Sequence, residues 1–77
     1  MNTIDAYMSP EDWAVQNWRK REILQLVSEG LSGYEIAEKL CLAYGTVHNM
    51  RSAMLKQLGA NNSSHAVGIG IRLGIIE

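Results

Sequence analysis

Several features that mark other classes of protein are scarce or missing in this chain of 77 residues. Cys41 is the only cysteine, which excludes an internal disulfide and fits a reducing compartment. No apolar run is long enough to span a bilayer, and the acidic start lacks the basic and then apolar pattern of a signal peptide. We therefore expect a cytoplasmic protein that does not enter the membrane.

A catalytic constellation is missing as well. Cys41 and His48 could suggest a nucleophile and a base, but no orienting acid or oxyanion site accompanies them in the pattern. Packing in the core or in a turn is the expected role of Cys41. We predict that the protein is not an enzyme, that it binds no metal and that it needs no cofactor.

Carboxylates are missing from one stretch, residues 41–60. The formal net charge is −1, yet residues 1–15 carry three acids and no Lys or Arg, whereas residues 16–76 carry seven basic residues against four acids. An acidic N-terminal extension, residues 1–15, thus precedes a mildly basic domain, residues 16–77. Such a domain is compatible with a polyanionic partner.

The residues that are present predict a small helical domain. Apolar residues make up 47% of the chain, which is ample for a compact fold and too much for disorder. Ser9 and Pro10 favour a helix from Pro10 to about Asn17. Ile23, Leu24 and Val27 form one face of a helix that Gly30 would end. A core of this size is marginal, so a partner subunit would help to stabilise it.

Three further helices are expected after Gly30. Ser32 and Glu35 have the spacing of a capping box. A longer helix begins near Tyr44 and ends at Gly59, and a fourth helix is expected from about Ser63 to Leu73, where alternating isoleucine and glycine also permit a strand. The apolar residues of the longer helix are spaced by three and four, which predicts one buried stripe: Val47, Met50, Met54, Leu55 and Leu58.

Two short helices separated by the break CLAYG, the second with a polar outer face, match the plan of a helix-turn-helix. In that plan the second helix presents side chains to base edges in the major groove of DNA. Its outer face carries donors only and no carboxylate that would repel phosphate. These donors are His48, Asn49, Arg51, Ser52 and Lys56.

The helix-turn-helix and its flanking residues resemble a known family. The segment EILQLVSEGLSGYEIAEKLCLAYGTVHNMRSAMLKQLGA resembles the LuxR-type (GerE-like) DNA-binding domain, and the likeness extends over residues 16–76. The matching positions are Glu22, Ile23, Leu24, Leu26, Val27, Gly30, Leu31, Ser32, Glu35, Ile36, Ala37, Leu40, Leu42, Thr46, Val47, Met54, Leu58, Gly59 and Ala60. The resemblance implies an all-α, four-helix bundle with a helix-turn-helix, here preceded by a short N-terminal helical extension.

The resemblance also implies a site and partners. Base contacts would fall on His48, Asn49 and Ser52, although His48 is nearly as well explained as an ordinary exposed histidine. Backbone contacts would fall on four further residues: Tyr44, Thr46, Arg51 and Lys56. Double-stranded DNA is the implied partner, and another transcription regulator or RNA polymerase is left open. With no room for a sensing domain, the chain would act as a stand-alone regulator.

The fourth helix would pair two copies into a homodimer. Its small residues Ala66, Gly70 and Gly74 would allow close approach, whereas the alternative for Gly74 is a simple helix stop. The tryptophans of the N-terminal part, Trp13 and Trp18, are expected to dock on the domain and extend its core, with a partner-binding surface as the alternative.

Five departures from the family pattern leave a second function open. They are Gly33, His48, Met50, Gln57 and Ser63, and four of them remove or weaken a cation or a polar donor. Each lost phosphate contact lowers the affinity for DNA. The alternative is a protein-interaction module of the same fold that binds and inhibits another regulator rather than DNA.

Overall fold

The computed structural model describes residues 8–77, and these residues form five helices and no strand. In chain order the helices are α2 (Pro10–Gln16), α3 (Trp18–Ser28), α4 (Gly33–Leu40), α5 (Tyr44–Leu58) and α6 (Ser63–Arg72). The predicted all-α bundle is confirmed as α3 to α6, and α2 is its N-terminal helical extension. The isoleucine- and glycine-rich segment is helical, not a strand. None of the helices within residues 8–77 is both long and apolar enough to cross a membrane.

The helices begin and end where local capping signals place them. The Ser9 hydroxyl accepts a hydrogen bond from the first turn of α2, and the Asn62 side chain does the same for α6. In the predicted capping box, the Ser32 N–H donates to Glu35 Oε1 (2.9 Å) and the Glu35 N–H donates to Ser32 Oγ (3.2 Å). Gly59 ends α5 with a φ of 69°, a left-handed conformation that glycine adopts without a Cβ clash.

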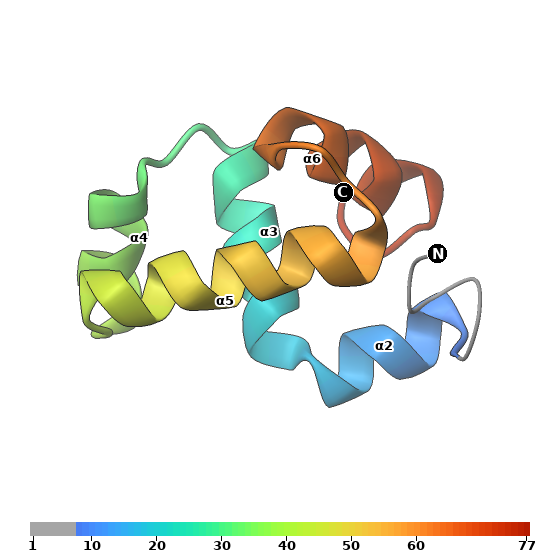
Figure 1. The fold of residues 1–77 in the computed structure, drawn as a ribbon, viewed down its shortest axis with the longest axis horizontal. Helices are drawn as coiled ribbons and strands as arrows, with labels where there is room; N and C mark the ends of the chain where they lie inside the picture. The colour runs from blue at the N-terminus through green and yellow to red at the C-terminus, as the bar shows by residue number, and fades with distance from the viewer. Residues whose placement is uncertain (1–7) are drawn as a thin grey trace.

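Helix α3 is the centre of the fold, because it packs against each of the other four helices. Figure 1 shows α5 crossing in front of α3, with α4 at the N-terminal end of α5 and α6 toward its other end. One side of α3 contributes Ile23 and Leu26 to an apolar cluster with α4 and α5. Leu24 faces a second cluster with α2, α5 and α6. Helix α3 thus divides the core into two parts that share one scaffold.

The second part of the core recruits α2 through Trp13. This side chain is fully buried, and its indole N–H donates to Gln57 Oε1 of α5 at 3.3 Å. The expectation that the N-terminal tryptophans extend the core is confirmed for Trp13. Trp13 comes before the compositional boundary after residue 15, yet it packs in the same core as residues that follow this boundary.

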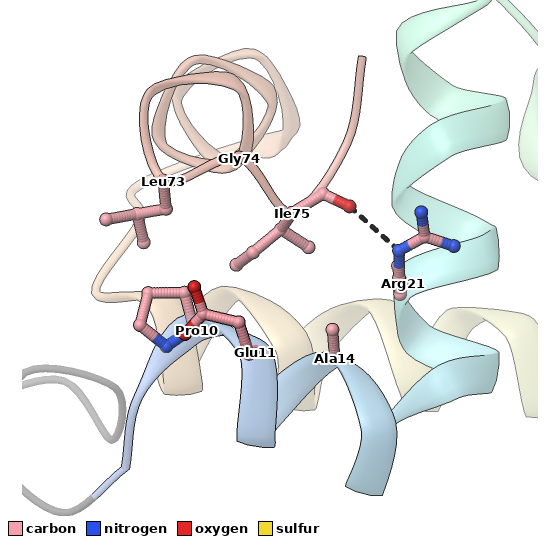
Figure 2. A pocket seen from close by; sticks show the side chains of 7 residues that line it. All are labelled: Pro10, Glu11, Ala14, Arg21, Leu73, Gly74 and Ile75. Carbon is pink, nitrogen blue, oxygen red and sulfur yellow. Dashed lines mark hydrogen bonds between the residues drawn. The ribbon is translucent and has the colours of Figure 1, made fainter.

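The C-terminal tail closes the same part of the core. Ile75 and Ile76 are buried, and Gly74, with a φ of 75°, turns the chain back toward α3. The Arg21 Nε–H donates to the Ile75 carbonyl at 2.8 Å (Figure 2). Figure 2 also shows the shallow pocket of about 260 Å³ that lies between α2, Arg21 and the tail. The tail and α2 therefore both pack on one side of the bundle, the side that lies away from the α4–α5 turn.

Candidate nucleic-acid interface

The turn between α4 and α5 sets the angle between these two helices. Cys41 ends α4 in a left-handed conformation (φ 56°, ψ 41°), and the Leu42 N–H donates to the Ala37 carbonyl at 2.9 Å. This 6→1 bond is characteristic of a Schellman helix end. Cys41 is exposed, so packing in the core is wrong, whereas the alternative position in the turn agrees with its place at the end of α4.

Helix α5 is amphipathic in the way a recognition helix requires. Val47, Met54 and Leu58 are buried against the two parts of the core. The opposite side is polar and carries no carboxylate along the whole helix. The predicted base-contact residues and most of the backbone-contact residues are exposed there: His48, Asn49, Ser52, Tyr44, Thr46 and Lys56. Because helical residues four apart share a face, four of these side chains form one row from Tyr44 to Lys56.

Aromatic rings extend this row toward α4. The Tyr44 ring stacks on Tyr34 of α4, with centroids 4.1 Å apart and planes 14° apart. On its other side Tyr44 faces the His48 ring, with centroids 6.3 Å apart. Arg51, which is half-buried, places its Nη1 3.8 Å from the point where a Cβ of Gly33 would lie. Tyr44 and Arg51 thus meet at the first turn of α4, and His48 lies on the other side of Tyr44.

Tyr34 was missed by the sequence-based prediction of contact residues. It is 70% exposed at the second position of α4, and sequence pattern alone gives an exposed tyrosine no role. Only its stacking on Tyr44, ten positions later in the chain, connects it with the polar row of α5.

The N-terminus of α5 has no side-chain cap. Ala43 occupies the N-cap position and accepts no hydrogen bond through its side chain. The first N–H groups of a helix have no partner within the helix, and the helix dipole favours an anion there. Exposed Thr46 lies in this first turn and adds a hydroxyl. This end of α5 can therefore accept a phosphate oxygen.

Internal contacts use three of the seven basic side chains. Arg19 pairs with Glu22 at 2.8 Å, Lys20 donates to Gln57 at 3.3 Å, and Arg21 donates to the C-terminal tail. The other four form no ion pair or hydrogen bond within residues 8–77: Lys39, Arg51, Lys56 and Arg72. Two of these four, Arg51 and Lys56, belong to α5, so this helix offers two cations to a polyanion.

Three departures from the family pattern have a structural reason. Gly33 lacks a Cβ where one would lie only 2.9 Å from the Tyr44 ring, so a larger residue there would displace the ring from its present place. Gln57 accepts hydrogen bonds from both Trp13 and Lys20, which ties α2 and α3 to α5. Met50 is half-buried against the cluster that joins α3, α4 and α5. These residues hold the fold together at positions where the family pattern has polar or basic side chains.

The predicted dimer surface needs correction. Ala66 is fully buried, and Gly70 is buried against Leu24 and Ile76, with a virtual Cβ only 2.9 Å from Leu24 Cδ2. Both residues face the interior of a single chain, so they cannot form the contact surface between two copies. Gly74 adopts the left-handed conformation of a helix stop, which agrees with the simpler alternative.

Trp18 differs from Trp13, since it is 58% exposed. The Arg19 guanidinium lies over its ring, 4.5 Å from the centroid. The expectation that both tryptophans dock on the domain is therefore wrong for Trp18. Val15, 75% exposed near the end of α2, is a second exposed apolar side chain close in sequence to the start of α3.

A short turn between two helices, a third helix packed behind them and a polar outer face on the second define the helix-turn-helix class. Residues 18–69 match the family of bacterial regulatory proteins named after luxR (GerE). The chain belongs to this family.

Curated relatives share the same part of the chain. It is 41% identical over 54 residues to the methanol utilization control regulatory protein MoxX of Paracoccus denitrificans, covering 70% of this chain and 24% of that protein. It is 38% identical over 59 residues to the transcriptional activator protein BjaR1 of Bradyrhizobium diazoefficiens, covering 77% of this chain and 24% of that protein.

The transcriptional regulatory protein DesR of Bacillus subtilis is 39% identical over 49 residues, covering 64% of this chain and 25% of that protein. The chain thus spans about a quarter of the length of these relatives. No solved structure matches it significantly.

Proposed function

We propose that this protein is a transcriptional regulator that binds double-stranded DNA by placing α5 in the major groove. One observation carries the proposal: α5 exposes an unbroken polar row without a carboxylate, on a helix-turn-helix of the luxR family. Relatives named as a transcriptional activator and as a transcriptional regulatory protein support it. Such a regulator would work in the cytoplasm, where the DNA is.

The side chains of α5 divide into two roles in this proposal. His48, Asn49 and Ser52 face the base edges, where hydrogen-bonding groups distinguish one base pair from another. Thr46 and the uncapped N-terminus of α5 receive one phosphate. Lys56, one turn beyond Ser52, meets the sugar–phosphate backbone, together with Arg51 and Tyr44 at the α4 side of the row.

The proposed roles are tested by comparing two variants on the same set of duplexes. Lys56→Ala removes a charge that any sequence can attract, so its affinity should fall equally for all duplexes. Asn49→Ala removes a base contact, so its affinity should fall most for preferred sequences, by about 1–3 kcal/mol. Equal losses on every duplex from Asn49→Ala would contradict base reading by Asn49.

A homodimer belongs to the same proposal, with the outer side of α6 as its contact surface. Ile71 is 53% exposed there, and the row on this side includes exposed Gly68 and Ser64. An apolar side chain beside small residues suits close packing of two helices. Sedimentation of wild type, Ile71→Glu and the matched control Val15→Glu tests the pairing, since only Ile71→Glu should shift the protein to monomer. Identical sedimentation of all three would contradict it.

The exposed apolar side chains of Val15 and Trp18 favour a second candidate, a module that binds another regulator through α2 and α3. Aromatic side chains are common anchors at interfaces between proteins. This candidate replaces the first if the wild-type protein fails to bind DNA at low salt.

A further inference from the structure

We propose that Tyr34, although it belongs to α4, is a further DNA-contact residue that donates a hydrogen bond to a backbone phosphate through its hydroxyl. The inference rests on the proposed placement of α5 in the major groove. It adds a contact that is neutral, lies outside α5 and is not among those predicted from the sequence.

Three aromatic rings follow one another from α5 to α4: His48, Tyr44 and Tyr34. Tyr44 and His48 belong to the outward row of α5, and the stacked Tyr34 ring continues from Tyr44 toward α4. The centroids of His48 and Tyr44 are 6.3 Å apart, and those of Tyr44 and Tyr34 are 4.1 Å apart. The major groove is about 12 Å wide. With His48 at the base edges, the third ring of this series, Tyr34, is expected near the wall of the groove, where the phosphates are.

The hydroxyl of Tyr34 is ready for such a contact. The ring is 70% exposed, and its hydroxyl forms no hydrogen bond to the protein within residues 8–77. Stacking restricts the ring before DNA arrives, so less side-chain entropy is lost on binding. Gly33 permits the stack, because any Cβ at that position would lie 2.9 Å from the Tyr44 ring.

A neutral donor and a charged donor differ in how their loss changes the salt dependence of binding. A lysine that neutralises a phosphate releases counterions, which changes the slope of log affinity against log salt by about 0.9 for each contact. A phenol hydroxyl neutralises no charge. Its loss should lower the affinity by the same factor at every salt concentration and leave the slope unchanged.

The experiment compares Tyr34→Phe with wild type on random-sequence duplex DNA at low and moderate salt. Tyr34→Phe keeps the stack and removes only the hydroxyl, so the affinity should fall about tenfold, as expected for a hydrogen bond to a charged group. Tyr34→Ala also removes the stack and should fall at least as far. Gln16→Ala, which removes an exposed polar side chain on α2, is the control and should bind as wild type.

Separate outcomes identify which inference fails. If wild type binds DNA and Tyr34→Phe binds equally well, the contact by Tyr34 is overturned while the proposed function stands. A change of slope in Tyr34→Phe would also overturn it, because the contact would then not be neutral. If wild type shows no salt-sensitive binding, the proposed function fails and this inference fails with it. Unchanged thermal unfolding of Tyr34→Phe is expected and shows that the loss is not a folding defect.

Discussion

Cys41 carries the conformational cost of the tight turn in the helix-turn-helix. Its φ of 56° places a residue with a Cβ in the left-handed region, which costs about 1–2 kcal/mol. The helices α3 and α5 end differently, since Gly30 and Gly59 take the left-handed positions there. A side chain at residue 41 is therefore tolerated by the fold and is not required by it.

Cys41→Gly is accordingly expected to stabilise the protein, by up to about 1 kcal/mol after the entropy cost of glycine in the unfolded chain is subtracted. The urea midpoint of unfolding should rise without a change of slope. Cys41→Ala, which keeps the Cβ, is the control and should bring no gain. A midpoint for Cys41→Gly at or below that of wild type would refute the assignment of strain to this residue.

The stability that the α4 capping box gives to the fold depends on pH through the carboxyl group of Glu35. The backbone N–H of Ser32, and to a lesser extent its hydroxyl, hold the pKa of the Glu35 carboxyl below its ordinary value of 4.5. A carboxyl whose pKa is lower in the folded state stabilises the fold at pH values above its unfolded pKa. This contribution is lost as the pH falls through the lowered folded-state pKa.

Glu35→Gln retains an acceptor without the charge, so it isolates this effect. At neutral pH the variant should melt at a slightly lower temperature than wild type. Well below the ordinary value of 4.5, where the wild-type carboxyl takes up its proton, the two melting temperatures should converge. A difference that stays constant from neutral to acidic pH would show that the charge of Glu35 is not involved.

Among the helices, α2 depends most on distant contacts. It has only seven residues, and a helix of that length is not stable alone in water. Trp13 connects it to the core, and the hydrogen bond from Trp13 to Gln57 connects it to α5. Helix α2 is thus stabilised by tertiary packing, and in turn it positions the C-terminal half of α5.

Trp13→Ala should lower the free energy of unfolding by roughly 3–5 kcal/mol, because a fully buried large side chain leaves a cavity. Val15→Ala lies on the same helix with an exposed side chain and should change it by no more than about 0.5 kcal/mol. Chemical unfolding of both variants measures the contrast. Similar effects from the two would mean that α2 does not contribute to the core through Trp13.

Local signals in the sequence predict most of these elements, whereas contacts between elements are less accessible. The capping residues Ser9, Ser32 and Asn62 act within one turn, so their pattern is sufficient to place three helix starts. On α6 small residues occur on both sides, Ala66 and Gly70 inside and Ser64 and Gly68 outside, so spacing alone does not identify the buried side.

The same limit applies to the candidate site. The outward row of α5 follows from its helical period, because Val47, Met54 and Leu58 define the buried side. The stack of Tyr34 on Tyr44 is a contact between two helices and has no local signal. The hydrogen bonds of Gln57 also join separate helices.

In the molecule as a whole, residues before and after the segment that matches the luxR family complete its apolar core. Residues 18–69 contain the helix-turn-helix, yet the second part of the core also needs Trp13 before this segment and Ile75 and Ile76 after it. These additions lie on the side of α3 away from the α4–α5 turn, which leaves the outward row of α5 uncovered. The fold therefore gains stability without using the surface proposed for DNA.

Binding of DNA by the outward row of α5 is tested most directly by titrating the purified protein with labelled random-sequence duplex DNA over a range of salt concentrations. When α5 docks on DNA, Arg51 and Lys56 should each neutralise one phosphate. Log affinity should therefore fall linearly with log salt, with a slope of about −1.8 or steeper for each chain. No binding at low salt, or binding that does not change with salt, would contradict the proposal that α5 docks on DNA.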